Sequence, residues 1–362
     1  MSDLRTVSVN LPGQAYNILV QPGLLSSAGS HVRALTGSSK IAVVTDTAVG
    51  PLYAETVARS LQAEGFEVIR AVVPAGEAHK NTRTIASIYD QILPAGIDRS
   101  TPLVALGGGV IGDMTGFAAA TILRGVPFVQ MPTTLLSMVD ASVGGKTGVD
   151  HAMGKNLIGA FHQPLAVLID PAVLRTLPPR ELRSGLAECI KHEIIRDADG
   201  FARLETRIDA ALALDIDYLA ELVAHNVDIK ARVVEADPFE KGQRAHLNFG
   251  HTFGHAIETV SNYTMAHGEC VALGMVAASR TAQWLGMLDR RSADRISSLI
   301  ASAGLPTGGL TLPVDAVVNA MIYDKKVRAG RIRFVLPTRI GAVTIRDDVP
   351  PETVRRAVES LR

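Results

Sequence analysis

The first half of the chain alternates short runs typical of β-strands with segments of helical periodicity. The runs are rich in Val, Ile and Leu, and amphipathic stretches lie between several of them. Parallel strands need long crossover connections, usually helices, and these helices cover the faces of the sheet. The alternation therefore predicts an α/β domain with a Rossmann-like parallel sheet. The expected strands are Ile41–Thr45, Val68–Val73, Pro102–Leu106, Phe128–Met131 and Ala166–Asp170, and the expected helices are Ala54–Glu64, Thr82–Leu93 and Asp113–Leu123.

The pattern changes at about Leu177, where Pro178-Pro179 opens a long series of helical periods. A chain of 362 residues is also too long for one ordinary hydrophobic core. We therefore predict an α/β domain over residues 1–176 and a mainly α-helical domain over residues 177–362. The expected helices are Arg180–Arg196, Phe201–Leu214, Tyr218–Ala236, Gly250–Ser261, Glu269–Leu285 and Arg291–Ala303, with a late hairpin of Arg331–Leu336 and Ala342–Ile345.

The charge balance excludes some classes of partner. The chain has 36 basic and 36 acidic residues and a formal net charge of zero, which gives no electrostatic case for nucleic acid or an anionic membrane. The first residues lack the layout of a signal peptide, and no apolar run approaches the length of a membrane span. The two cysteines, Cys189 and Cys270, make no disulfide framework. We expect a cytoplasmic protein that binds a small molecule.

His251 and His255 are four residues apart in a segment with helical periodicity, so both imidazoles would project from one helix face. Imidazole is the commonest metal ligand in proteins, and zinc sites often contain such a pair. A further ligand would come from elsewhere in the chain, and the candidates are Glu188 and His267. An isolated histidine pair at this spacing has a purely structural role about as often as it binds a metal. The pattern favours a metal site in the helical domain.

A glycine-rich turn follows the expected strand that ends at Leu106. Gly107, Gly109 and Gly112 satisfy G-x-G-x-x-G between a strand and a helix, where backbone N–H groups can approach a pyrophosphate. The turn comes late in the chain, however, and no acidic residue follows about twenty positions later, as an ordinary Rossmann motif requires. Asp113 could alternatively have the structural role of capping the helix that follows the turn. Nucleotide binding is predicted, but the nucleotide is not.

Two other segments have side chains suited to a nucleotide. Glu77 and Lys80 offer a carboxylate for ribose hydroxyls and an ammonium for phosphate. Asp46 ends the first clear strand, where a second ribose-binding acid is expected.

The segment 132–159 is dense in polar groups for an Ala-rich chain. Lys146 lies in a Gly-Lys-Thr sequence, but Asp140 occupies the position of the first glycine of a P-loop, which excludes that motif. Lysines, an asparagine and glycines suit a phosphorylated, hydroxyl-rich small molecule, and the alternative is a solvated loop. Downstream, Lys191 lies one helical turn after Glu188, and Lys230, Arg244 and Asn248 precede the histidine pair. Lysines at such positions are more often solvated.

Several blocks occur together in one order: Gly107–Asp113, Pro132–Lys146, 154–156, Leu177–Lys191, Asn248–Glu258 and 267–269. This combination resembles the 3-dehydroquinate synthases, a family of sugar-phosphate cyclases, from about Ile41 to Leu336. The resemblance implies a carbon–oxygen lyase of the shikimate pathway of aromatic amino-acid biosynthesis. Its substrate would be 3-deoxy-D-arabino-heptulosonate 7-phosphate and its products 3-dehydroquinate and phosphate. The implied steps are transient oxidation by NAD, β-elimination of phosphate, re-reduction and internal aldol closure.

The resemblance also assigns residues to roles. It implies that Glu188, His251 and His267 bind Zn²⁺, or alternatively Co²⁺, and that His255 turns toward the substrate phosphate. It implies a homodimer in which Arg124 reaches the site of the partner subunit. The implied NAD contacts are Asp46, Gly76, Glu77, Lys80, Gly108, Gly109, Gly112, Asp113, Thr133, Thr134, Lys146, Lys155 and Thr176. The implied catalytic and substrate contacts are Asp140, Lys146, Lys155, Asn156, Lys191, Lys230, Arg244, Asn248, His255, Arg124 and one of Lys325 and Lys326.

One position departs from the family pattern, because Ala48 stands where the family often has an asparagine. The departure implies that one cofactor hydrogen bond near Asp46 is missing or replaced. Other functions remain as alternatives: another sugar-phosphate cyclase, a metal-dependent polyol dehydrogenase, or a non-catalytic nucleotide-binding homologue. Asn248 and His255 both match the 3-dehydroquinate synthase pattern, which favours that member of the cyclases.

Overall fold

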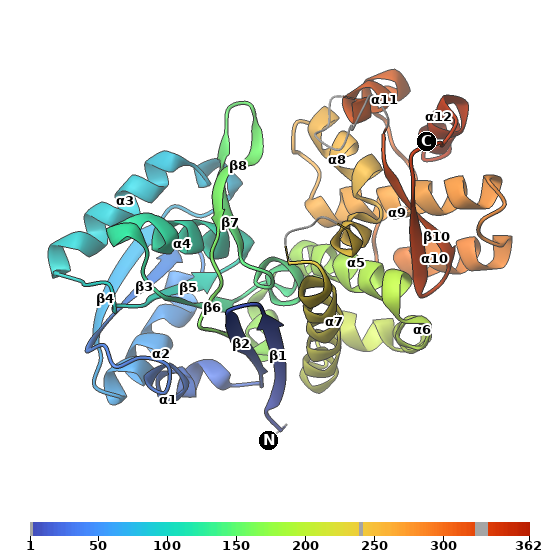
Figure 1. The fold of residues 1–362 in the computed structure, drawn as a ribbon. Helices are drawn as coiled ribbons and strands as arrows, with labels where there is room; N and C mark the ends of the chain where they lie inside the picture. The colour runs from blue at the N-terminus through green and yellow to red at the C-terminus, as the bar shows by residue number, and fades with distance from the viewer. Residues whose placement is uncertain (1–2, 239–241, 323–331) are drawn as a thin grey trace. The chain divides into compact units, whose positions relative to one another are not determined.

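The computed structural model describes residues 3–238, 242–322 and 332–362. The chain forms two compact units, shown in Figure 1. The first unit consists of Met1–Leu177 and Ile216–Glu235, and the second of Pro178–Asp215 and Ala236–Arg362. Helix α7 (Ile216–Ala236) therefore belongs to the first unit, although its sequence position had grouped it with the later helices. The first unit thus includes α7, which follows the change from strand–helix alternation to helical periods at about Leu177.

The first unit is built on a mixed sheet whose strands follow the order β1-β2-β9-β6-β5-β3-β4. The strand pairs from β2 to β4 in this order are parallel, and β1 pairs antiparallel with β2. β5 and β6 are buried along their whole length, as expected for parallel strands covered on both faces. The five predicted strands are confirmed. Their bounds are β3 Lys40–Asp46, β4 Glu67–Val73, β5 Leu103–Gly107, β6 Phe128–Pro132 and β9 Ala166–Ile169.

Helices lie on both faces of this sheet. The chain moves from β3 outward to β4 and then back across β3 to β5, and right-handed crossovers place helices from these two directions on opposite faces. Ile88 of α3 and Met114 and Ala118 of α4 accordingly share one buried core, while Figure 1 shows α1 and α2 on the other side. The bounds are α1 Ala28–Arg33, α2 Gly50–Ala63, α3 Thr82–Ile92 and α4 Gly109–Thr121.

Two hairpins of the first unit were not predicted. β1 (Arg5–Leu11) and β2 (Gln14–Val20) form an N-terminal hairpin, and β2 also pairs with β9. β7 (Lys146–His151) and β8 (Gly154–Phe161) form a separate hairpin. No residue of β8 is fully buried and four of its residues are polar or glycine, so the segment has little hydrophobic periodicity to reveal a strand.

The second unit is mainly helical, as predicted, with a small hairpin of β10 and β11. The helices expected in this unit are confirmed, and α11 and α12 are additional. No helix in the described part of the chain is long and apolar enough to cross a membrane. The bounds are α5 Pro179–Arg196, α6 Ala198–Leu212, α8 His251–Val260, α9 His267–Trp284, α10 Arg290–Ser302, α11 Val314–Ile322, α12 Pro351–Glu359, β10 Phe334–Arg339 and β11 Ala342–Arg346.

Candidate functional site

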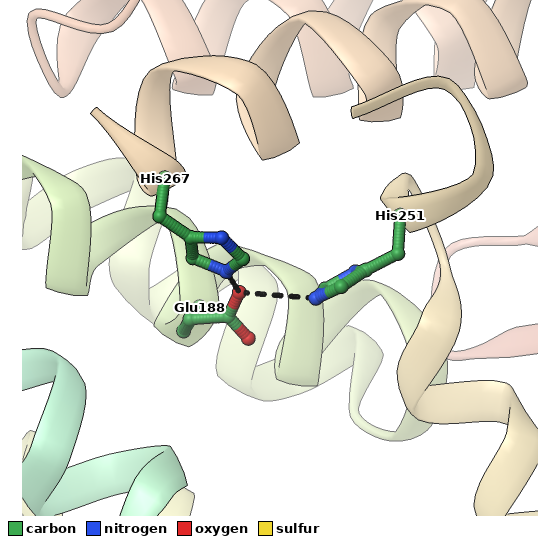
Figure 2. Close-up of side chains that lie close together, drawn as sticks. All are labelled: Glu188, His251 and His267. Atoms are coloured by element: carbon green, nitrogen blue, oxygen red, sulfur yellow. Dashed lines mark ion pairs between the residues drawn. The ribbon is translucent and has the colours of Figure 1, made fainter. Parts of the chain in front are cut away.

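The second unit brings three of the predicted metal ligands together, as Figure 2 shows. Glu188 lies in the middle of α5, His251 is the first residue of α8, and His267 is the first residue of α9. Glu188 Oε1 is 3.7 Å from His251 Nε2 and 3.5 Å from His267 Nε2. One ligand atom from each residue lies within 4.8 Å of the others.

These separations suit one small cation. Zinc bonds of about 2.1 Å in a tetrahedron place neighbouring ligand atoms about 3.4 Å apart, close to the two measured distances. The side chain of Glu188 is 1% exposed, whereas that of His267 is 34% exposed. Three protein ligands with one open side are typical of catalytic zinc, while structural sites close all four positions. The residues present therefore fit the metal that the sequence predicted.

Glycine contacts bring these ligands within reach of one another. A Cβ on Gly274 of α9 would lie 2.0 Å from the carbonyl oxygen of Gly250, so the backbones of α8 and α9 touch at this point. Gly268 packs in the same way on Ser184 of α5, whose hydroxyl accepts a hydrogen bond from the Gly268 N–H at 2.9 Å. Larger side chains at either position would push apart the helices that carry the ligands.

Buried groups behind the histidines orient their rings. His251 Nδ1 lies 3.1 Å from the carbonyl oxygen of Phe249, which fixes a proton on Nδ1 and leaves Nε2 as an acceptor. His267 Nδ1 lies 3.7 Å from Glu258 Oε2, and Glu258 is buried. Burial alone would lower the pKa of His267, but the carboxylates of Glu188 and Glu258 raise it to about 9. Lys191 also forms a buried ion pair with Glu188.

The histidine pair is divided in the structure. His255 lies on the same face of α8 as His251, with ring centroids 5.1 Å apart. Among the described residues, however, no metal-compatible group contains both rings. His251 groups with Glu188 and His267, whereas His255 groups with Glu258 and His267. The sequence pattern by itself had left both rings as candidate ligands of one metal.

In the first unit, the carboxyl ends of adjacent strands bring the predicted nucleotide residues to one edge of the sheet. Asp46 ends β3 opposite Val73 of β4, and Gly107 ends β5 opposite Pro132 of β6. The parallel strands run in the order β4-β3-β5-β6-β9, so the chain reverses direction between β3 and β5. Ligands of open α/β sheets bind at such a switch point. Gly76, Gly108, Gly109, Thr133 and Thr134 follow directly after these strand ends.

The glycine-rich turn also has the geometry of a nucleotide site. Helix α4 begins at Gly109, and its N-cap Gly108 provides no side chain, so the helix end presents backbone N–H groups. A Cβ on Gly112 would lie 2.8 Å from Gln130 Oε1. The hydroxyl of Thr133 is buried and has no hydrogen-bond partner among the described residues. A buried polar atom of this kind fits a bound polar ligand such as a dinucleotide.

Asp113 does not cap α4, which corrects the structural alternative from the sequence. It lies one turn into the helix, and its Oδ2 accepts a hydrogen bond from Lys80 Nζ at 2.7 Å. Lys80 Nζ also donates to Asn156 Oδ1 at 2.6 Å. Burial opposes the charge of Lys80, yet the carboxylates of Asp113 and Glu77 raise its pKa above the usual value. A buried ammonium thus links a predicted cofactor residue to a predicted substrate residue.

The tip of the β7–β8 hairpin carries a residue that sequence reasoning missed. Asp150 Oδ1 accepts a hydrogen bond from the backbone N–H of Asn156 at 2.8 Å, while Asn156 has a positive φ of 53°. Such a backbone is strained for a residue with a side chain. Asp150 therefore helps to hold Asn156 in place. In the sequence, only the position of an aspartate before a tight turn could have indicated this role. The neighbouring Lys155 pairs with Glu77 at 3.3 Å.

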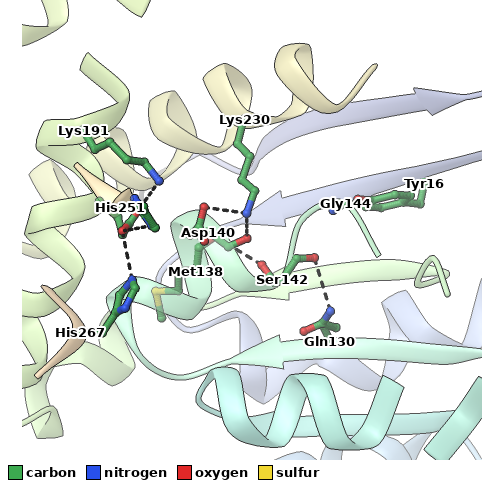
Figure 3. Close-up of polar contacts among 11 residues, drawn as sticks. Tyr16, Gln130, Met138, Asp140, Ser142, Gly144, Lys191, Lys230, His251 and His267 are labelled. Atoms are coloured by element: carbon green, nitrogen blue, oxygen red, sulfur yellow. Dashed lines mark hydrogen bonds and ion pairs between the residues drawn. The ribbon is translucent and has the colours of Figure 1, made fainter. Parts of the chain in front are cut away.

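Asp140 and Lys230 also meet in the first unit, as Figure 3 shows. Asp140 lies in a π-helical turn, Ser137–Ala141, a type of distortion that is frequent at functional sites. Lys230 of α7 is buried, and its Nζ donates to Asp140 Oδ1 at 2.7 Å and to the carbonyl oxygen of the same residue. This pair joins α7 to the rest of the first unit. Lys146 begins β7 after the same turn.

Other predicted residues have local partners. Asp46 Oδ1 accepts the backbone N–H groups of Ala48 and Val49 at 2.8 Å, so one of its oxygens shapes the start of α2. The Thr134 hydroxyl bonds Ser137, and the Thr176 hydroxyl bonds Tyr53. These contacts leave the predicted NAD roles as proposals.

The remaining predicted residues are spread over both units. Arg124 is exposed and has a positive φ of 65°. Arg244 and Asn248 lie in the short helix Gln243–Asn248 before α8, and Arg244 is buried. Lys325 and Lys326 lie outside the described residues, so the choice between them stays open.

Solved structures of several enzymes share this fold, among them a probable glycerol dehydrogenase of Sinorhizobium meliloti with a TM-score of 0.64 and 18% identity, covering 94% of each chain. The 2-epi-5-epi-valiolone synthase of Streptomyces hygroscopicus, solved with NAD⁺ and Zn²⁺ bound, has a TM-score of 0.88 and 30% identity, covering 97% of this chain and 98% of that chain. A 2-deoxy-scyllo-inosose synthase complexed with carbaglucose-6-phosphate, NAD⁺ and Co²⁺ has a TM-score of 0.91. It is 23% identical and covers 99% of this chain and 100% of its own, a likeness that shows the fold alone. The 30% identity over 97% of the chain, together with the donor set, places the protein in the sugar-phosphate cyclase class.

Sequence comparisons identify the family within that class. The model of the 3-dehydroquinate synthase N-terminal region matches residues 70–184, and that of the C-terminal region matches residues 185–327. The 3-dehydroquinate synthase of Nostoc punctiforme is 48% identical over 362 residues, which is 98% of this chain and 99% of that protein. The chain belongs to the 3-dehydroquinate synthase family.

Proposed function

We propose that this chain converts 3-deoxy-D-arabino-heptulosonate 7-phosphate to 3-dehydroquinate and phosphate, the 3-dehydroquinate synthase step of the shikimate pathway. The observation that carries the proposal is 48% identity to a 3-dehydroquinate synthase over 98% of the chain. The donor set of Glu188, His251 and His267 supports it, because this chemistry needs a Lewis acid beside the sugar hydroxyls.

The proposed cofactors are NAD and a divalent zinc or cobalt ion. Glu188, His251 and His267 would hold the metal, and the sheet edge near Asp46 and Gly109 would hold NAD. When bound, NAD would accept and return a hydride, and the metal would act as a Lewis acid for the substrate hydroxyls.

The groups around the metal ligands prepare this site. Glu258 faces His267 Nδ1 and so holds a proton on that atom, which leaves Nε2 for the metal. The buried ammonium of Lys191 compensates part of the charge of Glu188. His255 adjoins both histidine ligands without joining their donor group, and we assign it to the leaving phosphate.

Three lysines and an asparagine of the first unit suit the anionic ends of the substrate. We assign Lys146, Lys155, Asn156 and Lys230 to the phosphate and carboxylate of the sugar acid. Lys230 is held by Asp140, so its position is set before substrate arrives. Ammonium groups paired with carboxylates bind anions without acting as strong bases.

A direct assay tests the proposed function. Enzyme, the heptulosonate phosphate and a catalytic amount of NAD should yield equal amounts of phosphate and dehydroquinate, with no accumulation of NADH. Net NADH formation from a polyol would instead identify a dehydrogenase. Turnover of a different sugar phosphate, with none of the heptulosonate, would identify another cyclase. The cytoplasmic location expected from the sequence stays a prediction.

We also propose a homodimer in which Arg124 completes the site of the partner subunit. Its exposed side chain and left-handed backbone support this role, because strained residues are retained where the side chain must be aimed. Arg124→Ala and Glu188→Ala should each be inactive alone. Mixed dimers of the two would contain one complete site, so an equal mixture should regain about a quarter of the wild-type rate. No regained activity in verified mixed dimers would contradict the assignment.

A further inference from the structure

The turn from Asp140 to Lys146 carries a charged residue at each end, and both are assigned to the proposed substrate site. The five residues between them are uncharged. Gly144 and Gly145 have φ values of 100° and 66°, so the backbone here follows no regular helix or strand. Apart from the backbone hydrogen bond from Val143 to Asp140 at 3.1 Å, the contacts that fix the distance and direction between Asp140 and Lys146 come from groups outside the turn.

Buried contacts tie this turn to the rest of the first unit, and Figure 3 shows several of them. Gln130 Nε2 of β6 donates to the carbonyl oxygen of Ser142 at 3.4 Å, and the N–H of His162 donates to that of Gly145 at 2.8 Å. The N–H of Gly144 donates to Tyr16 Oη at 3.2 Å. Lys230 holds the Asp140 end.

Tyr16 is the most distant of these contacts in sequence, 128 residues from Gly144. It lies on β2 opposite Val9 and is 4% exposed, on the same buried side as Ile18 and Val20. β2 is fixed on both sides by β1 and β9. The phenol oxygen therefore has a defined position. Tyr16 also precedes the region matched by the family model, which begins at residue 70.

We propose that Tyr16 is a positioning residue for the proposed substrate site, acting through the N–H of Gly144 on the turn that carries Asp140 and Lys146. This inference rests on the proposed function. Replacing the phenol removes the hydrogen bond that ties the Gly144 N–H to β2, and the loss of a buried hydrogen bond costs free energy. The turn then shifts away from β2, and the ammonium of Lys146 shifts with it.

The test compares Tyr16→Phe with Tyr89→Phe. Both changes remove only a hydroxyl, and the Tyr89 hydroxyl bonds Thr121, away from the turn. Tyr16→Phe should raise the KM for the heptulosonate phosphate about tenfold, with a smaller change in kcat. In the same variant, amide hydrogen exchange should become faster in the segment of residues 140–147. Tyr89→Phe should change neither measurement, and both variants should remain folded at the assay temperature.

Three outcomes would overturn the inference. One is an unchanged KM in Tyr16→Phe together with wild-type exchange in the turn. Another is an equal rise in KM in both variants, since this would reflect a general loss of stability. The third is faster exchange without a change in KM, because the contact would then be structural only. Failure of the wild-type protein to release phosphate would instead overturn the proposed function, and the two failures are therefore distinguishable.

Discussion

Replacing Glu258 by glutamine should weaken metal binding although Glu258 is not a ligand. Its Oε2 lies 3.7 Å from Nδ1 of His267, while His267 Nε2 faces Glu188 on the other side of the ring. The carboxylate of Glu258 stabilises the Nδ1 proton and makes Nε2 a better donor to the metal. Glutamine keeps the shape and an acceptor oxygen but removes the charge.

The burial of Glu258 supports a large effect on metal affinity. Glu258 is 6% exposed, so solvent screens its interaction with the imidazole only weakly. Loss of such a partner typically costs a metal site about 10- to 100-fold in affinity. This range corresponds to about 1.4–2.7 kcal/mol of binding free energy.

Competition with a chromogenic zinc chelator measures the dissociation constant of each variant, and elemental analysis gives the metal content. Glu269→Gln is the matched control, because Glu269 lies two residues after His267 but pairs with Arg180 and caps α9. An affinity of Glu258→Gln within about twofold of wild type would refute the reasoning. An equal loss in Glu269→Gln would also refute it, since the effect would then not pass through His267.

The remaining predictions concern the same two units. Glu188→Ala should lose both zinc and phosphate release, and wild-type turnover in a chelated, metal-checked sample would contradict this. His255→Ala should keep zinc stoichiometric while slowing phosphate release by about 100-fold; loss of zinc would instead make His255 a ligand. The pKa of His267, raised from 6.5 to about 9, leaves its ring protonated at neutral pH in the metal-free protein. Zinc binding should therefore release about one proton and tighten as pH rises, which calorimetry in two buffers measures. Gly112→Ala should weaken NAD binding in a fluorescence titration, because its Cβ would lie 2.8 Å from Gln130 Oε1.

The sequence by itself determined the α/β and helical parts of the chain. Buried parallel strands such as β5 are continuous apolar runs, and helices such as α3 have clear amphipathic periodicity, so local pattern and tertiary environment agree. The glycine-rich turn and the two histidines were also visible, because their chemistry depends on residue type and short spacing. Family resemblance supplied the rest of the expected site.

Only the tertiary structure decided which of these residues meet. Contact between α8 and α9 at Gly274 groups His251 with Glu188 and His267 and leaves His255 outside that donor set. Helix α7 belongs to the first unit, where its Lys230 contacts Asp140, although sequence order had grouped it with the later helices. No sequence pattern marked Tyr16 as a site residue, since its proposed role depends on a hydrogen bond to a residue 128 positions away. Sequence periodicity reports which face of an element is buried, but the partner of a buried polar group is set by chain segments that only folding brings together.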